Sequence, residues 1–370
     1  MVVQNRIPSD MWEHARTFLP EDIDEIARRT GALCRARKAD AEQLLRGFLV
    51  YAHIGSLRSA SALTGASGLV DIKPESLFYR LSKANSFLSE VLAKLVSRHT
   101  SAPCGFRITI VDATMLSGDG ATGADWRVHV GYDPARGVPC SVHVTGPEVG
   151  ESFKLHHFRK GDLLLADRMY GTARNYSEAL AQGADLLVRV QSGRLRVYAL
   201  ESKVKWTELE SQVPPSGARS FEVRMPVPPD KTAHGNPWKT KDAIAWHDVR
   251  LIGARNLNGE VVWLMTNLAQ DRLSDESACS LYRTRWQIEL YFKRLKSLGD
   301  LGRLPSRDGP TAQAHLLAKL ILLVLTSFLC DKEAFPPYGY AVRAAKDAER
   351  PKPVARVRLH ATQASLCVAT

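Results

Sequence analysis

The sequence has no apolar run long enough to suggest a membrane span. Its longest uninterrupted apolar run covers positions 320–325, inside a wider apolar stretch at 316–330. That stretch is interrupted by Lys319, Thr326 and Ser327. A membrane-spanning helix needs about 20 predominantly apolar residues. We therefore expect a buried helix at this place and no membrane partner.

Paired cysteines and a leader pattern are also missing. The six cysteines stand far apart, at positions 34, 104, 140, 279, 330 and 367. Without a Cys-x-x-Cys pair they indicate neither a zinc ribbon nor a disulfide framework. The first sixteen residues have no basic segment followed by an apolar one, as a signal peptide would. We expect a reducing, cytoplasmic setting.

Acidic residues are fewer than basic ones. The chain has 370 residues with 50 Lys and Arg against 39 Asp and Glu, a formal net charge of +11. Such an excess favours an anionic partner, with nucleic acid as the first candidate. Part of it is concentrated at 281–308, where seven basic residues accompany three acidic ones. The length allows two or three domains, and 45% hydrophobic with 24% charged residues is globular composition.

Residues 1–100 are expected to form an all-helical domain, because apolar residues recur there at spacings of three and four. The expected helices span 21–29, 39–52, 56–63, 74–81 and 85–98. A basic cluster lies between the first two of them, made of Arg28, Arg29, Arg35, Arg37 and Lys38. It is either an ordinary solvated helix face or part of a helix-turn-helix-like DNA-binding domain.

The pattern of region 101–191 predicts several strands, followed by alternating helices and strands. Expected strands cover 106–112, 126–132, 139–145, 163–166 and 185–190, and a helix is expected at 173–182. The wholly apolar run at 163–166 suits a strand that is buried on both faces. The sequence therefore predicts a mixed α/β sheet.

Three further regions follow. Residues 192–268 predict a β-rich insertion with strands near 194–198, 220–225, 244–254 and 260–266, and Asn258-Gly259 is a strong two-residue hairpin turn. Helical patterns return in 269–330, at about 274–298 and at 313–329. The last part, 331–370, is proline-containing and basic, and is interpreted as a loosely packed tail.

The expected helix at 281–298 carries a narrow polar stripe. At about 100° per residue, Tyr282, Arg285, Glu289 and Lys296 fall within an arc of about 60° beside the apolar face. An ordinary explanation is an i,i+4 pair of Arg285 with Glu289, worth about 0.2–0.5 kcal/mol. An alternative is a helix that lines a cleft, where the acid holds a metal ion and the basic and aromatic groups hold phosphates.

Two aspartates complete a possible cation site. Asp112 is expected at the end of the first strand, and Asp167 follows the buried strand at 163–166. A carboxylate beside an apolar strand is costly to bury unless it is paired or coordinated. Each aspartate alone could be a turn or cap residue. Together with a glutamate on a helix across the sheet, they predict a two-metal site.

These motifs resemble those of DDE transposases of the bacterial insertion-sequence-four family. The first acid lies in Ile110-Val111-Asp112-Ala113-Thr114 and the second in Leu165-Ala166-Asp167-Arg168-Met169-Tyr170-Gly171. The third matches the family's Tyr-Arg-Glu-Lys signature as Tyr282-x2-Arg285-x3-Glu289-x6-Lys296. The likeness covers roughly 100–330 and departs at Met169, where the family often has glycine. It implies an RNase H-like (retroviral integrase-like) catalytic core with a β-rich insertion after a helical DNA-binding domain.

The resemblance also implies roles for particular residues. Asp112, Asp167 and Glu289 would be the catalytic acids and would bind two Mg²⁺ or Mn²⁺ ions. The DNA-binding residues would be Tyr282, Arg285, Trp286, Lys293, Lys296 and Arg168. The implied reaction is cleavage at the inverted-repeat ends of an insertion sequence and strand transfer to target DNA, by a homodimer holding both ends. A bacterial protein of this kind would be cytoplasmic and nucleoid-associated.

Two alternatives remain open from the sequence. One is a metal-dependent nuclease of the same fold that does not join strands, and the other is a non-catalytic DNA-binding protein derived from a transposase. The other acidic residues are interpreted as less important. Glu148, Glu151 and Asp162 are taken as loop residues, with Asp119 and Asp125 as minor alternatives for metal ligation. The pair His156-His157 is not expected to bind a metal.

Overall fold

The fold is taken from a computed structural model of the chain. It describes residues 9–33, 39–96, 106–117, 125–199, 202–229, 240–298, 301 and 309–329. Part of the basic cluster (Arg35, Arg37 and Lys38), the expected loop residue Asp119 and the whole of 331–370 lie outside these residues.

The described part of the first hundred residues contains six helices. They are α1 (Ser9–Arg16), α2 (Ile23–Arg29), α3 (Ala41–Ile54), α4 (Leu57–Ala66), α5 (Pro74–Leu81) and α6 (Asn85–Val96). Helix α3 shows why they begin and end where they do. Asp40 and Gln43 form a reciprocal capping box at its start, and Gly55 closes it with a left-handed φ of 75°. Helix α1 was not expected from the sequence, because its eight residues are mostly polar.

A single ten-stranded sheet has the order β3-β2-β1-β4-β5-β10-β9-β8-β6-β7. Its first five strands are β1 (Arg107–Leu116), β2 (Trp126–Asp133), β3 (Val138–Thr145), β4 (Asp162–Ala166) and β5 (Asp185–Val190). Strands β1, β4 and β5 run parallel, and β2 and β3 pair antiparallel beside β1. All five residues of β4 are buried. The mixed α/β sheet expected from the sequence is confirmed.

The β-rich region extends this same sheet. Strand β10 (Val261–Thr266) pairs antiparallel with β5, and β9 (Ala245–Arg255), β8 (Ala218–Val227), β6 (Tyr198–Ala199) and β7 (Ser202–Lys203) follow outward. The strand expected at 194–198 was largely wrong, since only Tyr198 of it is extended. A turn that contains Asn258-Gly259 does join β9 to β10, with Gly259 at a φ of 82°. The two-residue loop was wrong, since residues 256–260 separate the last paired residues, Arg255 and Val261.

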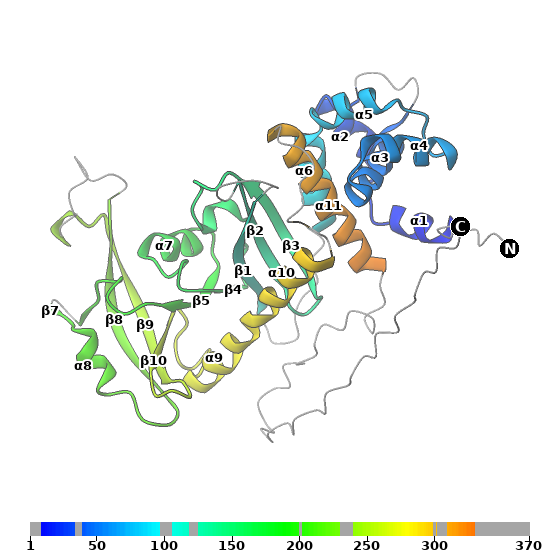
Figure 1. Cartoon of the computed structure of the whole chain (residues 1–370). Helices are drawn as coiled ribbons and strands as arrows, with labels where there is room; N and C mark the ends of the chain where they lie inside the picture. The colour runs from blue at the N-terminus through cyan, green and yellow to red at the C-terminus, as the bar shows by residue number, and fades with distance from the viewer. Residues whose placement is uncertain are drawn as a thin grey trace, which may run out of the picture.

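Helices cover both faces of the sheet (Figure 1). On one face, α7 (Ala173–Ala181) and α8 (Trp206–Glu210) enclose a core with Leu164, Leu186 and Trp263. On the other face, α9 (Asp275–Tyr282) and α10 (Trp286–Leu298) share a core with Ile110 and Leu165. Short 3₁₀ turns lie at η1 (Phe153–Leu155), η3 (Thr240–Asp242) and η4 (Arg283–Arg285).

The long apolar helix α11 (Gly309–Leu329) packs against α3 and α6, beside the helices of the first hundred residues (Figure 1). Asn85 at the start of α6 donates from Nδ2 to the carbonyl of Pro310 at 3.1 Å. By length and composition α11 is the one helix of the described residues that is able to cross a membrane. However, 61% of its most apolar window is buried within the protein. It has the character of the buried helix predicted at 316–330.

Candidate active site

Asp112 lies within β1, not at its end. The strand continues to Leu116, and Asp112 pairs with Val130 of β2. The expectation of a strand-terminal aspartate was therefore wrong, because Ala113 to Leu116 also fit a strand that has β2 on one side. The Oδ1 atom of Asp112 accepts a hydrogen bond from the backbone N–H of Ala113 at 2.8 Å.

Asp167 directly follows β4, as expected. Its Oδ1 atom accepts from the backbone N–H of Met169 at 2.7 Å, and the N–H of Tyr170 donates to the carbonyl of Asp167 at 3.2 Å. These bonds form a tight turn that fixes the carboxylate. Met169 is itself exposed and leaves that turn intact.

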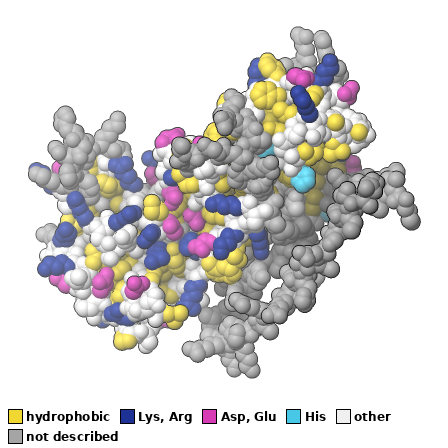
Figure 2. Space-filling model, in the orientation of Figure 1, with side chains coloured by type: hydrophobic (Ala, Val, Ile, Leu, Met, Phe, Trp, Pro, Cys, Tyr) yellow, Lys and Arg dark blue, Asp and Glu magenta, His cyan; other side chains and the backbone are white. Residues whose placement is uncertain are grey.

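The sheet register brings the two aspartates together. Val111 of β1 is paired with Ala166 of the parallel strand β4, so Asp112 and Asp167 come one residue later on adjacent strands. Residues two apart on a strand share a face. Ile110 and Leu165 belong to the core on the α10 side, and this places both aspartates there. Figure 2 shows acidic side chains gathered on the visible face near these strands, with Lys and Arg around them.

The electrostatics of the pair are unfavourable in the absence of a cation. Burial, and then the negative charges of Asp167 and Glu151, raise the pKa of Asp112 to about 7, although the Ala113 N–H and Arg285 oppose the rise. Two negatively charged carboxylates side by side repel one another, and this destabilises the folded protein unless a positive charge lies close to both. Their arrangement favours cation binding.

Glu289 is linked to this pair through Arg285. The Nη2 atom of Arg285 donates to Oε1 of Glu289 at 2.6 Å, and Nη1 lies 3.6 Å from Oδ2 of Asp112. The side chain of Glu289 is 54% exposed, whereas that of Asp112 is 16% exposed. Within the described residues, no three His, Cys, Asp or Glu side chains are arranged to hold a metal ion. Glu289 is therefore near the aspartates but does not converge with them in this conformation.

Tyr282 is placed by a break in the helix. The continuous helix expected up to Leu298 is divided by the 3₁₀ turn η4 into α9 and α10. The projection of residues 281–298 onto one helix, at about 100° per residue, was therefore wrong at residues 283–285. Even so, the hydroxyl of Tyr282 donates to the carbonyl of Ala166 at 3.1 Å, directly before Asp167. Burial raises the pKa of Tyr282 to about 12.

The other expected DNA-binding residues lie on the outside of the same region. Trp286 and Lys293 line a shallow hollow along α10 together with Leu290, Arg294 and Ser297. Lys296 and Arg168 are exposed. All four are on the protein surface.

Sequence reasoning missed the placement of Glu151, which was taken as an ordinary loop residue. The negative charge of Glu151 adds to the effects that raise the pKa of Asp112 and the pKa of Tyr170. No local pattern marks such a residue, since its neighbours 146–152 form an irregular loop. Only the fold, which packs this loop against the turn after β4, brings it there.

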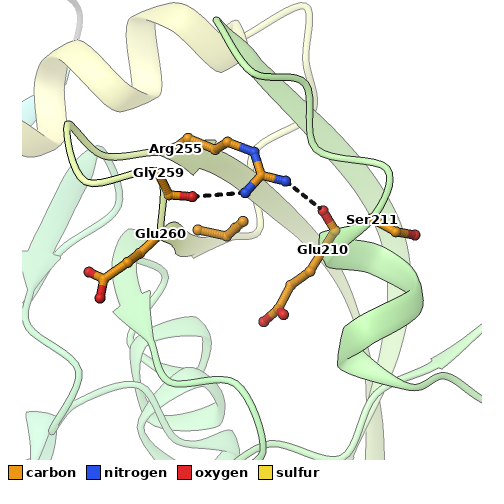
Figure 3. Close-up of a pocket in the computed structure, with 6 residues that line it drawn as sticks. Glu210, Ser211, Arg255, Gly259 and Glu260 are labelled. Carbon is orange, nitrogen blue, oxygen red and sulfur yellow. Dashed lines mark hydrogen bonds between the residues drawn. The ribbon is translucent and has the colours of Figure 1, made fainter.

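Another hollow, between α8 and the β9–β10 turn, is different in character (Figure 3). Its central side chain, Arg255, donates to the carbonyls of Gly259 at 2.8 Å, Glu210 at 3.3 Å and Val213 at 3.4 Å. Because these backbone oxygens engage the guanidinium, it acts as a brace for the turn. We assign no site there.

Comparisons with known proteins show a family and several relatives. Residues 103–325 match the family described as "Transposase DDE domain". The chain is 30% identical over 354 residues to a putative transposase InsL for insertion sequence element IS186A of Escherichia coli (strain K12), covering 88% of this chain and 94% of that one. It is likewise 30% identical over 355 residues to the transposase for insertion sequence element IS421 of Escherichia coli, with the same coverage of 88% and 94%.

More distant similarity extends to other proteins. The chain is 22% identical over 400 residues to the transposase for insertion sequence element IS231F of Bacillus thuringiensis subsp. israelensis, covering 90% and 81%. A solved piggyBac transposase synaptic complex with hairpin DNA aligns at a TM-score of 0.47 and 7% identity, over 88% of this chain and 76% of that one. By the family match and the two relatives at 30% identity, this chain belongs to the DDE-domain transposases of insertion sequences.

Proposed function

We propose that this protein binds the inverted-repeat ends of an insertion sequence, cleaves them and transfers the strands to target DNA. The observation that carries the proposal is the position of Asp112 on β1 beside Asp167, directly after the parallel strand β4, with Arg285 in contact with both Asp112 and Glu289. We further propose that the sheet is an RNase H-like core and that the chain belongs to the Tyr-Arg-Glu-Lys group of the insertion-sequence-four family.

The residues present fit a pair of Mg²⁺ or Mn²⁺ ions. Hard divalent cations prefer carboxylate oxygens, and the mutual repulsion of the buried carboxylates is relieved by positive charge. Asp112, Asp167 and Glu289 would hold the ions, which would activate the attacking oxygen and stabilise the leaving oxygen of the phosphodiester. For Glu289 to take part, its hydrogen bond with Arg285 has to open.

The remaining groups hold DNA in this proposal. Arg285 pairs with Glu289 in the free protein and becomes available to a phosphate when that pair opens. Tyr282 anchors the start of the helix segment against the backbone before Asp167. Lys296, Lys293 and Arg168 supply exposed positive charge for the DNA backbone, and Trp286 offers a ring for stacking on a displaced base.

We also propose an all-helical N-terminal domain that binds the transposon end, and a homodimer that holds two ends together. Two ends must be cut and joined in concert, and this is most simply achieved by two copies of one active site. Such a protein works in the cytoplasm, at the nucleoid. The exposed Arg28 and Arg29 of α2 are compatible with a role in end binding.

The test is an assay with labelled terminal inverted-repeat DNA and Mg²⁺. Joined products with target DNA support the proposal. Cleavage without joining supports the alternative of a nuclease, and binding without either supports a non-catalytic DNA-binding protein. The flanking DNA of the gene gives a second check, because imperfect inverted repeats bracketed by a short direct duplication are expected only for a mobile element.

A further inference from the structure

Strand β5 lies between β4 and β10 in the middle of the sheet and contains one exposed residue. Positions 186–188 and 190 of this strand are buried, whereas Arg189 is exposed. A charged side chain on a central strand destabilises the fold unless it is paired or reaches water. The exposure of Arg189 shows that the described helices leave this position of the sheet open.

The register of the sheet places Arg189 beside Asp167. Ala166 of β4 is paired with Val188 of the parallel strand β5. Asp167 and Arg189 come one residue later on these two neighbouring strands. The same reasoning places Asp167 beside Asp112 on the other side of β4, so the three residues form a row across the sheet.

Arg189 also lies on the same face of the sheet as the two aspartates. Leu187 comes two residues before Arg189, and residues two apart on a strand share a face. Leu264 is the partner of Arg189 on β10. Both leucines belong to the core on the α10 side, the side on which Asp112 and Asp167 lie. The row of three charged residues therefore has one common face.

Close backbone packing fixes Arg189 relative to the turn of Asp167. Gly171 directly follows that turn, and a Cβ added to Gly171 would lie 2.5 Å from the carbonyl oxygen of Arg189. Only glycine allows two backbone segments to approach so closely. The electrostatics agree with this placement. Burial raises the pKa of Tyr282, whose hydroxyl donates to the carbonyl before Asp167, and the positive charges of Arg285 and Arg189 oppose that rise.

The guanidinium of Arg189 has no hydrogen bond and no ion pair within the described part of the chain. The other charged residue of β5 is different, since Asp185 accepts from Asn267 at 2.7 Å and from Arg272 at 3.2 Å. Arg189 and Asp167 are thus side by side without a salt bridge between them. The carboxylate remains available to a cation, and the guanidinium remains available to an anion.

More positive charge lies at the same turn. Arg168 is exposed within it, and Arg194 donates from Nη1 to the sulfur of Met169 at 3.9 Å. An anion that approaches Asp167 has to be accompanied by positive charge, since the carboxylate repels it. A phosphodiester with divalent cations meets this condition, because the cations bridge carboxylate and phosphate oxygens.

We propose that Arg189 is a further phosphate-binding residue, which holds the phosphodiester to be cleaved beside Asp112 and Asp167. A guanidinium suits this task, since its parallel N–H groups donate to two phosphate oxygens at once. The inference rests on the proposed function and deepens it, because it names a side chain of the sheet itself that holds the DNA strand at the reacting atoms.

The sheet offers a matched control on its other face. Arg219 of β8 is exposed, and its guanidinium lies 5.4 Å from the ring centroid of Phe221, which packs against the core on the α7 side. Arg189→Gln and Arg219→Gln each remove one positive charge from a strand of the same sheet. Only the first is expected to affect DNA binding at the cleavage position. Arg189→Lys keeps the charge and loses the pair of parallel donors.

The experiment measures the affinity of the full-length protein for inverted-repeat ends by fluorescence anisotropy, without divalent cations so that the DNA stays uncut. Arg189→Gln is expected to weaken binding roughly tenfold, as loss of one charged hydrogen bond does. It should also make the slope of log affinity against log salt concentration shallower by about 0.9, the value for one phosphate contact. Arg189→Lys should lie between this variant and the wild type, and Arg219→Gln should bind as the wild type does.

Uncharged methylphosphonate groups at single positions of the DNA backbone locate the contact. At the phosphate that is cleaved, the uncharged group should weaken binding by the wild type and cause no further loss in Arg189→Gln. The reason is that the side chain and the phosphate form one contact, which is lost only once. At phosphates several base pairs away, the two losses should add.

The outcomes separate this inference from the proposed function. If the wild type binds and cleaves the ends while Arg189→Gln keeps its affinity and salt dependence, the role of Arg189 is disproved and the proposed function stands. The same holds if the two losses add at the cleaved phosphate. If the wild type does not bind inverted-repeat DNA, both are wrong. If Arg189→Gln unfolds at a lower temperature, by as much as a core truncation does, Arg189 is a structural residue and the inference fails.

Discussion

Two arginine–carboxylate arrangements lie along the helical segment that carries Glu289, one at its start and one near its middle. At its start, Arg250 of β9 donates from Nη1 to Asp275 at 2.9 Å and from Nη2 to the carbonyl of Leu273 at 2.5 Å. The side chains of that pair are 2% and 7% exposed. Further along, Arg285 is shared between Asp112 and Glu289, at 3.6 and 2.6 Å.

The difference lies in how charge is balanced. At the start of α9, one buried cation meets one buried anion and a carbonyl, which suits an anchor between the outer strands and the helix. Around Arg285, one cation faces Asp112 and Glu289 while Asp167 and Glu151 add further negative charge nearby. A balanced pair stabilises the fold, whereas an excess of one sign in a partly open place indicates a site that binds the opposite charge.

The largest expected effect is the loss of DNA cleavage when one of the acidic residues near Arg285 is removed. Asp112→Ala, Asp167→Ala or Glu289→Ala should reduce cleavage of inverted-repeat DNA by roughly 10³-fold, the size typical of losing a main electrostatic group of an active site. Binding to the ends, measured by gel shift, should remain within a few-fold of wild type. Retained cleavage in any of the three variants would contradict its assignment to the catalytic acids.

The next largest effect concerns the anchor. Arg250→Met leaves Asp275 buried without its cation and should lower the free energy of unfolding by about 3–5 kcal/mol. Urea denaturation measures this loss. Adding Asp275→Leu should restore much of it, because a buried apolar pair avoids the cost of a lone charge. A loss below about 1 kcal/mol in the single variant would show that this pair is no stronger than a surface pair.

His315 of α11 is a buried titratable group that lies in neither of these two charge arrangements. Both ring nitrogens lack a partner, its ring lies edge-on to Tyr51 at 4.9 Å, and burial lowers its pKa to about 3. Unfolding lets this histidine take up a proton below about pH 6.5. Its contribution to stability is therefore lost as pH falls from about 6.5 towards 3, by up to about 1.4 kcal/mol per pH unit.

The measurement is urea denaturation of wild type and His315→Leu between pH 7 and 4. The difference in unfolding free energy should move in favour of the variant as the pH falls. His129 and His156 are also buried with lowered pKa values and contribute equally to both proteins. A difference that does not change with pH would show that His315 takes up its proton in the folded protein as readily as in the unfolded one.

The smallest expected effect on stability is at the shared arginine. Arg285→Ala and Lys296→Ala should change the free energy of unfolding by only about 0.2–0.5 kcal/mol, as for exposed helix pairs. Both should weaken the complex with inverted-repeat ends more than the fold, as judged by footprinting. A drop in thermal stability as large as that of a core truncation would show that Arg285 is an anchor like Arg250.

Strands and most helices could be predicted from the sequence, because local periodicity determines them. The buried strand β4 and the turn at Asn258-Gly259 are examples, because the sequence pattern of each is compatible with few other local structures. Asp167 was placed correctly because the apolar run before it ends abruptly. Asp112 was wrongly predicted at the end of β1. The residues after it fit a continuing strand as well as they fit a turn, so their pattern does not show where the strand ends.

Other features depend on contacts between distant residues. The 3₁₀ turn η4 between α9 and α10 has no breaker residue, and it forms where Tyr282 reaches the backbone of β4. The continuation of one sheet from β5 into β10 requires pairing of segments that are some seventy residues apart, for which the pattern of either strand carries no signal. The loop that carries Glu151 packs against the turn after β4 through the stack of Phe153 on Tyr170, which no local pattern predicts.

The central claim, that a divalent cation binds at Asp112 and Asp167, is tested most directly by iron-directed cleavage of the polypeptide. Fe²⁺ replaces Mg²⁺, and ascorbate with peroxide generates radicals that cut the backbone beside the bound metal. The account predicts cuts close to Asp112 and Asp167 in the wild type, and their loss in Asp167→Asn. Cuts confined to other places, such as the hollow of Arg255, or the same cuts in the variant, would contradict it.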